Sequence, residues 1–73
     1  MIKAIVTEYI ERSYEDEYEF FKKFNTRKEA VKFFKSGKYV ISTKEDYDLE
    51  RTEYDSDIDK YWHSFVKFEE ITD

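Results

Sequence analysis

A single segment, residues 25–38, carries the start, middle and end signals of one short helix. At its start, Thr26 can cap the free backbone N–H groups of the first turn, and Glu29, three residues later, can reach back to the N–H of the capping residue. At its end stands Gly37, the only glycine of the chain, where a residue in left-handed conformation often terminates a helix. The rest of the chain is therefore expected to pack around one short helix.

The middle of this segment has amphipathic spacing. Apolar side chains at intervals of three and four residues predict one apolar helix face. They are Ala30, Phe33 and Phe34, with Val31 beside them. The other face carries Lys28, Lys32 and Lys35. The apolar face of the helix is therefore expected to pack against the core.

The apolar composition favours a sheet as the partner of this helix. The chain of 73 residues contains seven Phe, seven Tyr and one Trp, whereas Leu49 is its only leucine. Aromatic and β-branched side chains suit the half-buried surface of a sheet. A chain of this length forms one domain, residues 1–73, and buries only about 60% of its unfolded surface, so it needs each large side chain.

Two strands are expected before the helix. Residues 2–11 alternate between two partly apolar faces and are rich in β-branched side chains, which predicts a strand. Residues 13–17 are polar and are expected to turn the chain. Residues 18–24 alternate again, which favours a second, antiparallel strand. A helix beginning at Tyr14 is the alternative, because the aromatic residues of this stretch also fall at helical spacing.

Two strands are expected after the helix, at residues 39–42 and 60–71. Residues 44–59, between them, have no consistent period and form either a long exposed loop or a charged hairpin arm with residues 47–54 as one extended side. The predicted fold class is α+β, with one short helix packed on a small, mostly antiparallel sheet. The expected order is β-β-α-β-β, with an acidic insertion before the last strand.

One short helix cannot cover both faces of four strands. The covered face is expected to hold Ala4, Val6, Phe20, Phe24, Trp62, Val66 and Phe68. The opposite face then keeps Ile5, Tyr9, Phe21, Tyr61 and Phe65 exposed. Apolar patches of more than a few hundred Å² usually mark a binding surface or a dimer interface. We therefore expect the residues Ile5, Tyr9, Tyr61 and Phe65 to contact a partner or a second copy across a two-fold axis.

The formal net charge of −5 is unevenly distributed along the chain. Residues 44–59 contain eight acidic and two basic residues, a sum of −6, so the remainder carries +1. Residues 22–38 contain seven basic residues and one acid. The acidity is therefore local, and it lies outside the helix.

We expect this acidic segment to be the partner-binding site. Carboxylates spaced along an extended backbone imitate the charge of nucleic-acid phosphates, so a protein groove lined by Lys and Arg would accept them. Tyrosines add contact area at low entropic cost. The predicted partner-binding residues are Glu45, Asp46, Tyr47, Asp48, Glu50, Glu53, Tyr54, Asp55, Asp57 and Asp59. A solubilising loop that shields a sheet edge is the alternative.

The acid–tyrosine runs at residues 45–48 and 53–55, the small size and the absence of Cys and Pro give the chain a resemblance to a class of inhibitors. It resembles small phage-encoded inhibitors of host defence, among them anti-CRISPR and anti-restriction proteins that are similar to DNA in charge. This compositional resemblance implies a non-enzymatic inhibitor that occupies a basic groove of a host protein, such as a nuclease, in the bacterial cytoplasm. It assigns no role to individual residues. The basic helix departs from a uniformly acidic mimic, so a local acidic edge is expected.

A second hypothesis uses the lysine face of the helix. Lys28, Lys32 and Lys35 can contact phosphates, and nearby aromatic rings can stack on single-stranded bases. The sequence pI of about 4.9 weighs against nucleic acid as the main ligand. The leading hypothesis therefore includes no direct contact with nucleic acid. The third hypothesis is the homodimer described above.

Catalytic sites and cofactors are not expected. The chain has no Cys, which excludes a disulfide framework, a thiolate nucleophile and the usual zinc sites. His63 is the only histidine, and its neighbour Ser64 would point to the other face of a strand. Because no apolar run is long enough for a membrane span or a signal peptide, we expect a soluble protein without a membrane partner.

No metal site is expected either. Asp55, Asp57 and Asp59 have the initial spacing of a calcium loop. Lys60, however, stands where that loop needs glycine, and Val66 stands where it needs a bidentate glutamate. The three aspartates therefore indicate a solvated loop.

Overall fold

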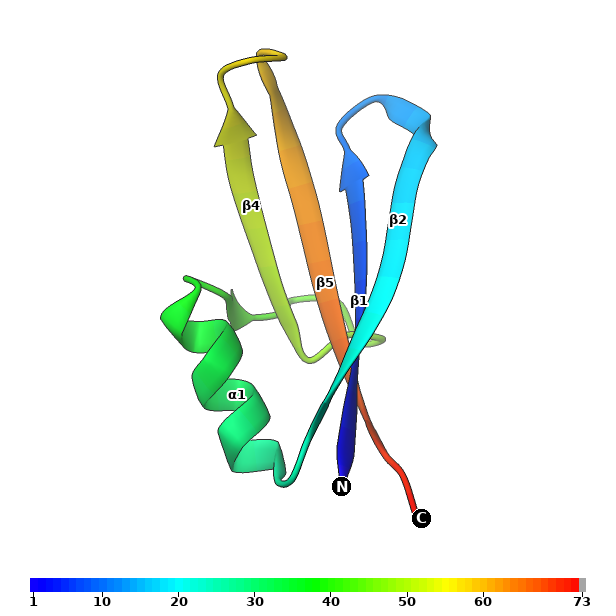
Figure 1. Cartoon of the computed structure of the whole chain (residues 1–73). Helices are drawn as coiled ribbons and strands as arrows, with labels where there is room; N and C mark the ends of the chain where they lie inside the picture. The colour runs from blue at the N-terminus through cyan, green and yellow to red at the C-terminus, as the bar shows by residue number, and fades with distance from the viewer. Residues whose placement is uncertain (73) are drawn as a thin grey trace.

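The computed structural model describes the backbone of residues 1–72 and the side chains of these residues except 13–16. Its elements, in chain order, are β1 (Ile2–Ile10), β2 (Ser13–Phe24), α1 (Arg27–Ser36), β3 (Val40–Ile41), β4 (Leu49–Asp55) and β5 (Lys60–Glu70) (Figure 1). The strands form one antiparallel sheet in the order β2-β1-β5-β4-β3. The α+β class is thus confirmed, but the order of elements is β-β-α-β-β-β.

The additional strand is β4, which lies inside the predicted acidic insertion. It pairs with β5 along its whole length, from Leu49 opposite Val66 to Asp55 opposite Lys60. The hairpin interpretation of this segment is therefore correct. The strand expected at residues 39–42 is reduced to two paired residues, because only Val40 and Ile41 reach β4 at the edge of the sheet.

The strand interpretation of residues 18–24, in place of a helix from Tyr14, is also correct, but the expected turn at residues 13–17 is wrong. The chain turns earlier, at Arg12, whose φ is 65°. The residues after it already belong to β2, with Glu17 opposite Tyr9. Polar composition suits a turn but does not exclude a strand, so composition alone does not place this turn.

The predicted start of α1 is confirmed, whereas the conformation predicted for its end is not. The hydroxyl of Thr26 accepts a hydrogen bond of 3.2 Å from the backbone N–H of Glu29. At the other end Gly37 has a φ of −89°, and the left-handed residue is Lys38, with a φ of 69°. Gly37 therefore ends the helix without using the conformation that favours glycine.

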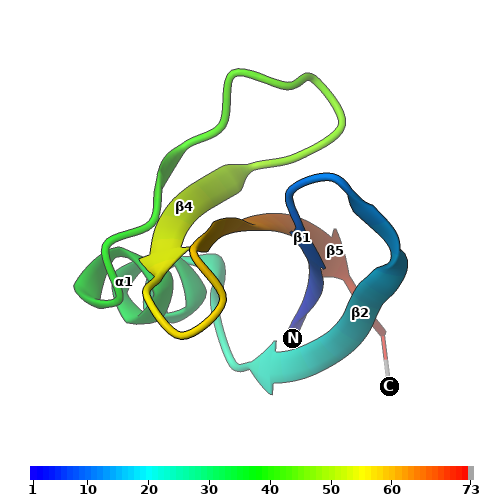
Figure 2. The ribbon, with the colours of Figure 1, turned by 90° about the horizontal axis from the view of Figure 1, so that it is seen from above.

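The core lies between α1 and the face of the sheet that curves toward it (Figure 2). Its buried members are Ala4, Val6, Ala30, Phe34, Tyr39, Leu49, Val66 and Phe68. A helix of ten residues is about 15 Å long, whereas the eleven residues of β5 extend over about 35 Å. The helix therefore covers only one half of the sheet. Phe20, expected in the core, is 49% exposed because it lies on the edge strand β2, opposite the buried Val6, and Phe33 is 46% exposed.

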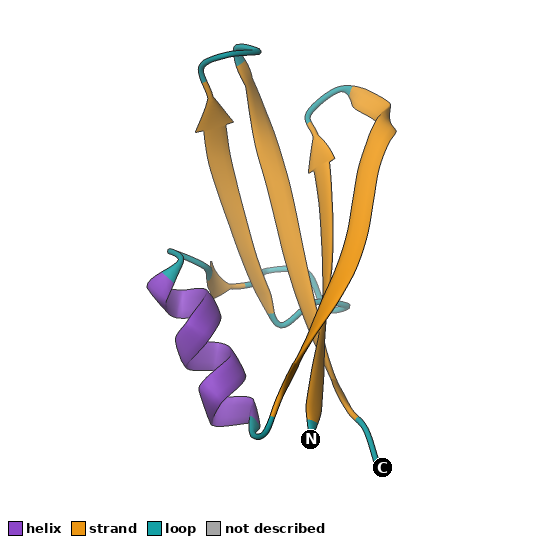
Figure 3. Ribbon diagram, in the orientation of Figure 1, coloured by secondary structure: helices purple, strands orange, loops and turns teal. Residues whose placement is uncertain are grey.

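The uncovered half consists of the tips of two hairpins, β1–β2 and β4–β5, which rise side by side (Figure 3). They lie at the same end of the sheet because Ile10 pairs with Trp62 and the N–H of Glu11 donates to the carbonyl of Tyr61 at 2.9 Å. The molecule measures 40 × 23 × 22 Å. Its long axis therefore runs from the helix-covered half to the hairpin half.

Candidate functional site

The predicted acidic segment does not form one continuous surface. Glu45 and Asp46 lie in the loop before β4, whereas Asp57 and Asp59 lie in the turn after it. The seven residues of β4 separate the two groups by about 20 Å, at ~3.3 Å per residue. The ten predicted partner-binding residues therefore do not lie in one adjacent row.

Two of the predicted partner-binding carboxylates hold the loop before β4 in place. Asp48 accepts one hydrogen bond from Arg27 and one from the backbone N–H of Phe68, both at 2.8 Å. Glu50 accepts the backbone N–H of Thr43 at 2.9 Å. These contacts attach the loop before β4 to the helix and to β5. They give both carboxylates a structural role, since charge-assisted hydrogen bonds are stronger than neutral ones.

The tip of the β4–β5 hairpin gathers the other acidic residues. Asp55 accepts the indole N–H of Trp62 at 3.1 Å and the backbone N–H of Asp57 at 3.0 Å. The hydroxyl of Tyr54 donates to Asp59, and this hydrogen bond raises the pKa of Tyr54 above its ordinary value. The rings of Tyr54 and Tyr61 pack edge to face, 5.2 Å apart. The turn is therefore ordered by its own carboxylates.

The β1–β2 hairpin adds further carboxylates to the same end. Glu11 and Glu17 are exposed and flank the turn that lies beside the β4–β5 tip. We call the combined group the acidic end, whose described acidic residues are Glu11, Glu17, Glu53, Asp55, Asp57 and Asp59. Arg12 and Lys60 are the basic residues at the two turns. The sequence analysis did not include Glu11 and Glu17; they could have been found by pairing the first strand with the last, which brings the two turns together.

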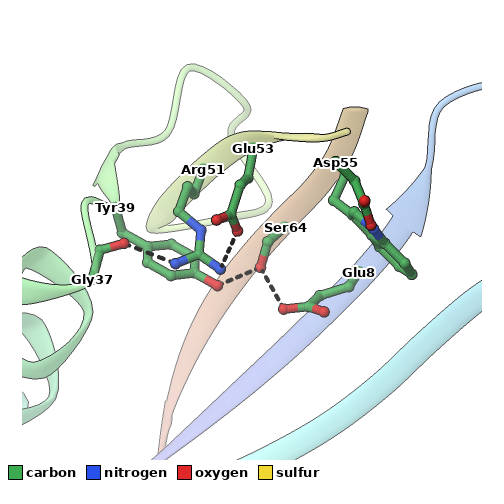
Figure 4. Close-up of polar contacts among 8 residues, drawn as sticks. Glu8, Gly37, Tyr39, Arg51, Glu53, Asp55 and Ser64 are labelled. Atoms are coloured by element: carbon green, nitrogen blue, oxygen red, sulfur yellow. Dashed lines mark hydrogen bonds and ion pairs between the residues drawn. The ribbon is translucent and has the colours of Figure 1, made fainter. Parts of the chain in front are cut away.

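A second cluster of polar side chains lies on the helix-side face of the sheet (Figure 4). The hydroxyls of Tyr39 and Ser64 are 2.5 Å apart, and Ser64 donates to a carboxylate oxygen of Glu8 at 3.3 Å. Because Ser64 uses its single proton toward Glu8, Tyr39 is the donor to Ser64. The result is a buried chain of hydroxyls that orients the Glu8 carboxylate.

Arg51 borders this chain of hydroxyls. Its guanidinium lies 4.5 Å from the ring of Tyr39, donates to the carbonyl of Gly37 at 2.8 Å and approaches Glu53 at 3.5 Å. Its Nε is buried without a hydrogen-bond partner among the described residues. A cavity of about 400 Å³ opens beside it and is also lined by Trp62. The sequence analysis missed this cluster because its members come from β1, β4, β5 and the segment after α1.

The predicted lysine face is present at the other end of the molecule. Lys28, Lys32 and Lys35 are exposed on α1. Lys22, on β2, extends this basic surface and places its ammonium 4.1 Å from the ring centre of Phe33. The charges are therefore separated along the long axis, with the lysines on the helix-covered half and the acidic end at the hairpin tips.

The predicted second face exists, but it is partly covered. The register places Ile5, Tyr9, Phe21, Tyr61 and Phe65 on one side of the sheet, as expected. Phe65 is only 5% exposed because the ring of Tyr47 lies 4.9 Å from it and the ammonium of Lys44 lies 4.4 Å from it. The expectation that Phe65 is an exposed dimer contact is therefore wrong, since the loop before β4 folds back over it.

The single histidine and the aspartate triplet form no recognisable reactive centre among the described residues. His63 lies on the face opposite to Ser64; its Nδ1 is 3.4 Å from the hydroxyl of Thr52 and its ring packs 5.2 Å from that of Tyr9. No three carboxylates or histidines come together as metal ligands in the part of the chain that the structure describes.

Comparisons with known proteins leave the chain without a family. No protein-family model matches it, and neither a curated protein nor a solved structure is significantly similar to it. Within residues 1–72, no helix has the length and apolar character needed to cross a membrane. The geometry of the chain itself is thus the basis for a functional proposal.

Proposed function

We propose that this chain is a non-enzymatic protein-binding inhibitor that docks its acidic end on a basic, nucleic-acid-binding surface of a partner protein. The observation that carries the proposal is the convergence of six carboxylates from two hairpins on one end of an elongated molecule. The tyrosines Tyr18, Tyr54 and Tyr61 are exposed on these hairpins. Exposed tyrosines beside carboxylates suit a surface that contacts Lys and Arg side chains.

The charge separation supports this orientation. A positively charged groove attracts the acidic end and repels the lysine-bearing half, so the field of the whole molecule would steer the encounter. Opposite charges that meet at an interface mainly increase the association rate, and salt weakens this effect. The resemblance to phage-encoded anti-defence inhibitors makes a host nuclease the first class of partner to test.

The proposal is tested first by capture of a partner and then by charge reversal. The tagged chain is exposed to a bacterial lysate at low and high salt, with and without nuclease treatment, and the retained protein is identified and purified. Capture of a basic protein that withstands nuclease treatment and is reduced by salt is the expected result. Capture that nuclease abolishes would contradict it.

The charge-reversal variant is Glu11→Lys, Glu17→Lys and Asp57→Lys. Within the described structure these three side chains make no hydrogen bond or ion pair, so the fold is expected to persist. We expect affinity for the purified partner to fall at least about tenfold, mainly through slower association. The control reverses Glu45 and Asp46, which belong to the same acidic segment as Asp57 but lie about 20 Å from it. Equal losses in both variants would contradict docking through the acidic end.

Nucleic-acid binding through the lysine face is the second candidate. It is favoured by one observation, the exposed ring of Phe33 beside the ammonium of Lys22 and the lysines of α1. Replacement of Lys28, Lys32 and Lys35 by Glu would abolish nuclease-sensitive retention if this candidate is right. The same replacement would leave docking through the acidic end intact.

A further inference from the structure

The strand β2 forms a long open edge of the sheet. It is the outermost strand on its side, and among the described strands it pairs only with β1 (Figures 1 and 2). The opposite edge is β3, which has two residues. Natural proteins usually shorten or cover an edge strand, because its free N–H and C=O groups can pair with another chain. The strand β2 is twelve residues long. Its residues 17–21 are exposed, and no other described element covers them.

The same strand exposes aromatic rings on both of its faces. Phe21 is 58% exposed on one face, and Tyr18 and Phe20 are 55% and 49% exposed on the other. Rings on both faces of an open edge would become buried if a further strand were added beside β2. The edge therefore has an apolar centre in addition to its backbone groups.

The charges of β2 identify the strand that fits beside it. Glu17 and Glu19 precede the aromatic centre, and Lys22 and Lys23 follow it. In an antiparallel arrangement a second copy of β2 places its lysine-bearing end beside this glutamate-bearing end. A parallel arrangement places like charges opposite each other, which is unfavourable. The strand is therefore complementary to itself in one direction only.

We propose that two copies of this chain associate edge to edge through β2, antiparallel, about a two-fold axis that passes through the pair of Phe21 residues. This axis is perpendicular to the sheet, so each face of one copy continues into the same face of the other. Phe21 then lies opposite its counterpart, Glu19 lies opposite Lys23, and Phe20 lies opposite Lys22. The two five-stranded sheets become one continuous sheet.

Within the described part of the isolated chain, these charges face no oppositely charged residue across the sheet. Across the β1–β2 ladder Lys23 is paired with Lys3, a like charge, and Glu19 is paired with Thr7. In the dimer each Lys23 gains a glutamate on its free side, and the pairing occurs twice by symmetry. The two acidic ends then point in opposite directions, so a dimer presents two docking ends.

The test measures molar mass by sedimentation equilibrium over a dilution series. Wild type is expected to shift from dimer to monomer on dilution. Glu19→Lys and Lys23→Glu are each expected to weaken dimerisation about tenfold or more, because each substitution creates two like-charge pairs. An equimolar mixture of the two variants is expected to restore the dimer. In that mixed dimer the introduced lysine faces the introduced glutamate, and the unchanged Lys23 of one copy faces the unchanged Glu19 of the other.

Three outcomes would overturn the proposal: a monomer at every wild-type concentration, a dimer that both variants leave unchanged, or a mixture with no gain in mass. Circular dichroism of each variant shows whether it is folded, and recovery in the mixture also excludes misfolding. Tyr61→Lys, on β5 and away from the β2 edge, is the control and is expected to leave the mass unchanged. Loss of the dimer in Tyr61→Lys alone would instead assign the contact to the sheet face that holds Ile5, Tyr9 and Tyr61.

Discussion

The helix-covered half and the hairpin half of the sheet use the same long strands, but different interactions hold them. In the covered half, the small side chains Ala4, Val6 and Val66 lie buried under α1. In the hairpin half, Tyr54 and Tyr61 pack across the strands while remaining exposed, and carboxylates accept hydrogen bonds from aromatic side chains. Stability is thus concentrated at one end, and a charged, solvent-facing surface at the other.

This contrast indicates why so small a domain can carry a strongly acidic surface. Exposed cross-strand pairs contribute only about 0.2–1 kcal/mol each, whereas a buried large apolar side chain contributes about 1.5–3 kcal/mol. The core therefore stabilises the strands, and the tips extend from it with little contribution of their own. The residues at the tips are therefore little constrained by the stability of the fold.

The largest expected effect compares two phenylalanines, one buried between α1 and the sheet and one exposed on the edge strand β2. Phe34 is buried in the core and packs against the rings of Tyr39 and Phe68, so Phe34→Ala is expected to lower the free energy of unfolding by about 3–5 kcal/mol. Phe20→Ala, on the exposed edge strand, is expected to cost less than about 1 kcal/mol. Urea denaturation, with an osmolyte added if Phe34→Ala is unfolded without it, measures both. Equal losses would mean that burial between α1 and the sheet does not set the contribution of these rings to stability.

An intermediate effect distinguishes structural from free carboxylates. Asp48→Ala removes the acceptor for Arg27 and for the backbone N–H of Phe68, which is expected to cost about 1–3 kcal/mol. Asp46→Ala, two residues earlier and exposed, is expected to change the free energy of unfolding by less than about 0.5 kcal/mol. The same denaturation experiment measures both. A stable Asp48→Ala variant would show that the loop before β4 needs no attachment to α1 and β5.

The smallest expected effect concerns the order of the β4–β5 turn. The hydrogen bond to Asp59 raises the pKa of Tyr54, because the bond favours the protonated phenol. A raised pKa in the folded state contributes stability that is present below the unfolded pKa and is lost as the pH rises through the folded pKa. We therefore expect the turn to weaken only in strongly alkaline solution.

This expectation is measured by titration of ¹³C-labelled tyrosine followed by NMR. Asp59→Ala removes the acceptor and is expected to lower the pKa of Tyr54 toward its ordinary value. Glu45→Ala, which lies before β4, is the control and is expected to leave the Tyr54 titration unchanged. An identical Tyr54 titration in wild type and in Asp59→Ala would mean that the side chains of the turn do not hold this bond in solution.

Local patterns predicted the elements that depend on neighbours in the sequence. The cap at Thr26 predicted the helix start, and strict alternation predicted which side chains of β1 and β5 share a face. The same approach was wrong about the turn before β2 and about the conformation of Gly37. In both places several local conformations suit the residues. The conformation before β2 accompanies the longer β1–β2 hairpin, and the conformation of Gly37 accompanies the hydrogen bond from Arg51 to its carbonyl.

The sequence by itself therefore determined a small α+β fold, the position of its helix and the alternation of its faces, because these follow from periodicities of two and 3.6 residues. Only the tertiary structure decided which carboxylates make no contact within the described chain. The pairing of β1 with β5 brings Glu11 beside the β4–β5 turn, and the return of the loop over Phe65 buries a ring that alternation alone left exposed. Both depend on contacts between residues far apart in the chain, whose geometry is fixed by strand register and loop closure.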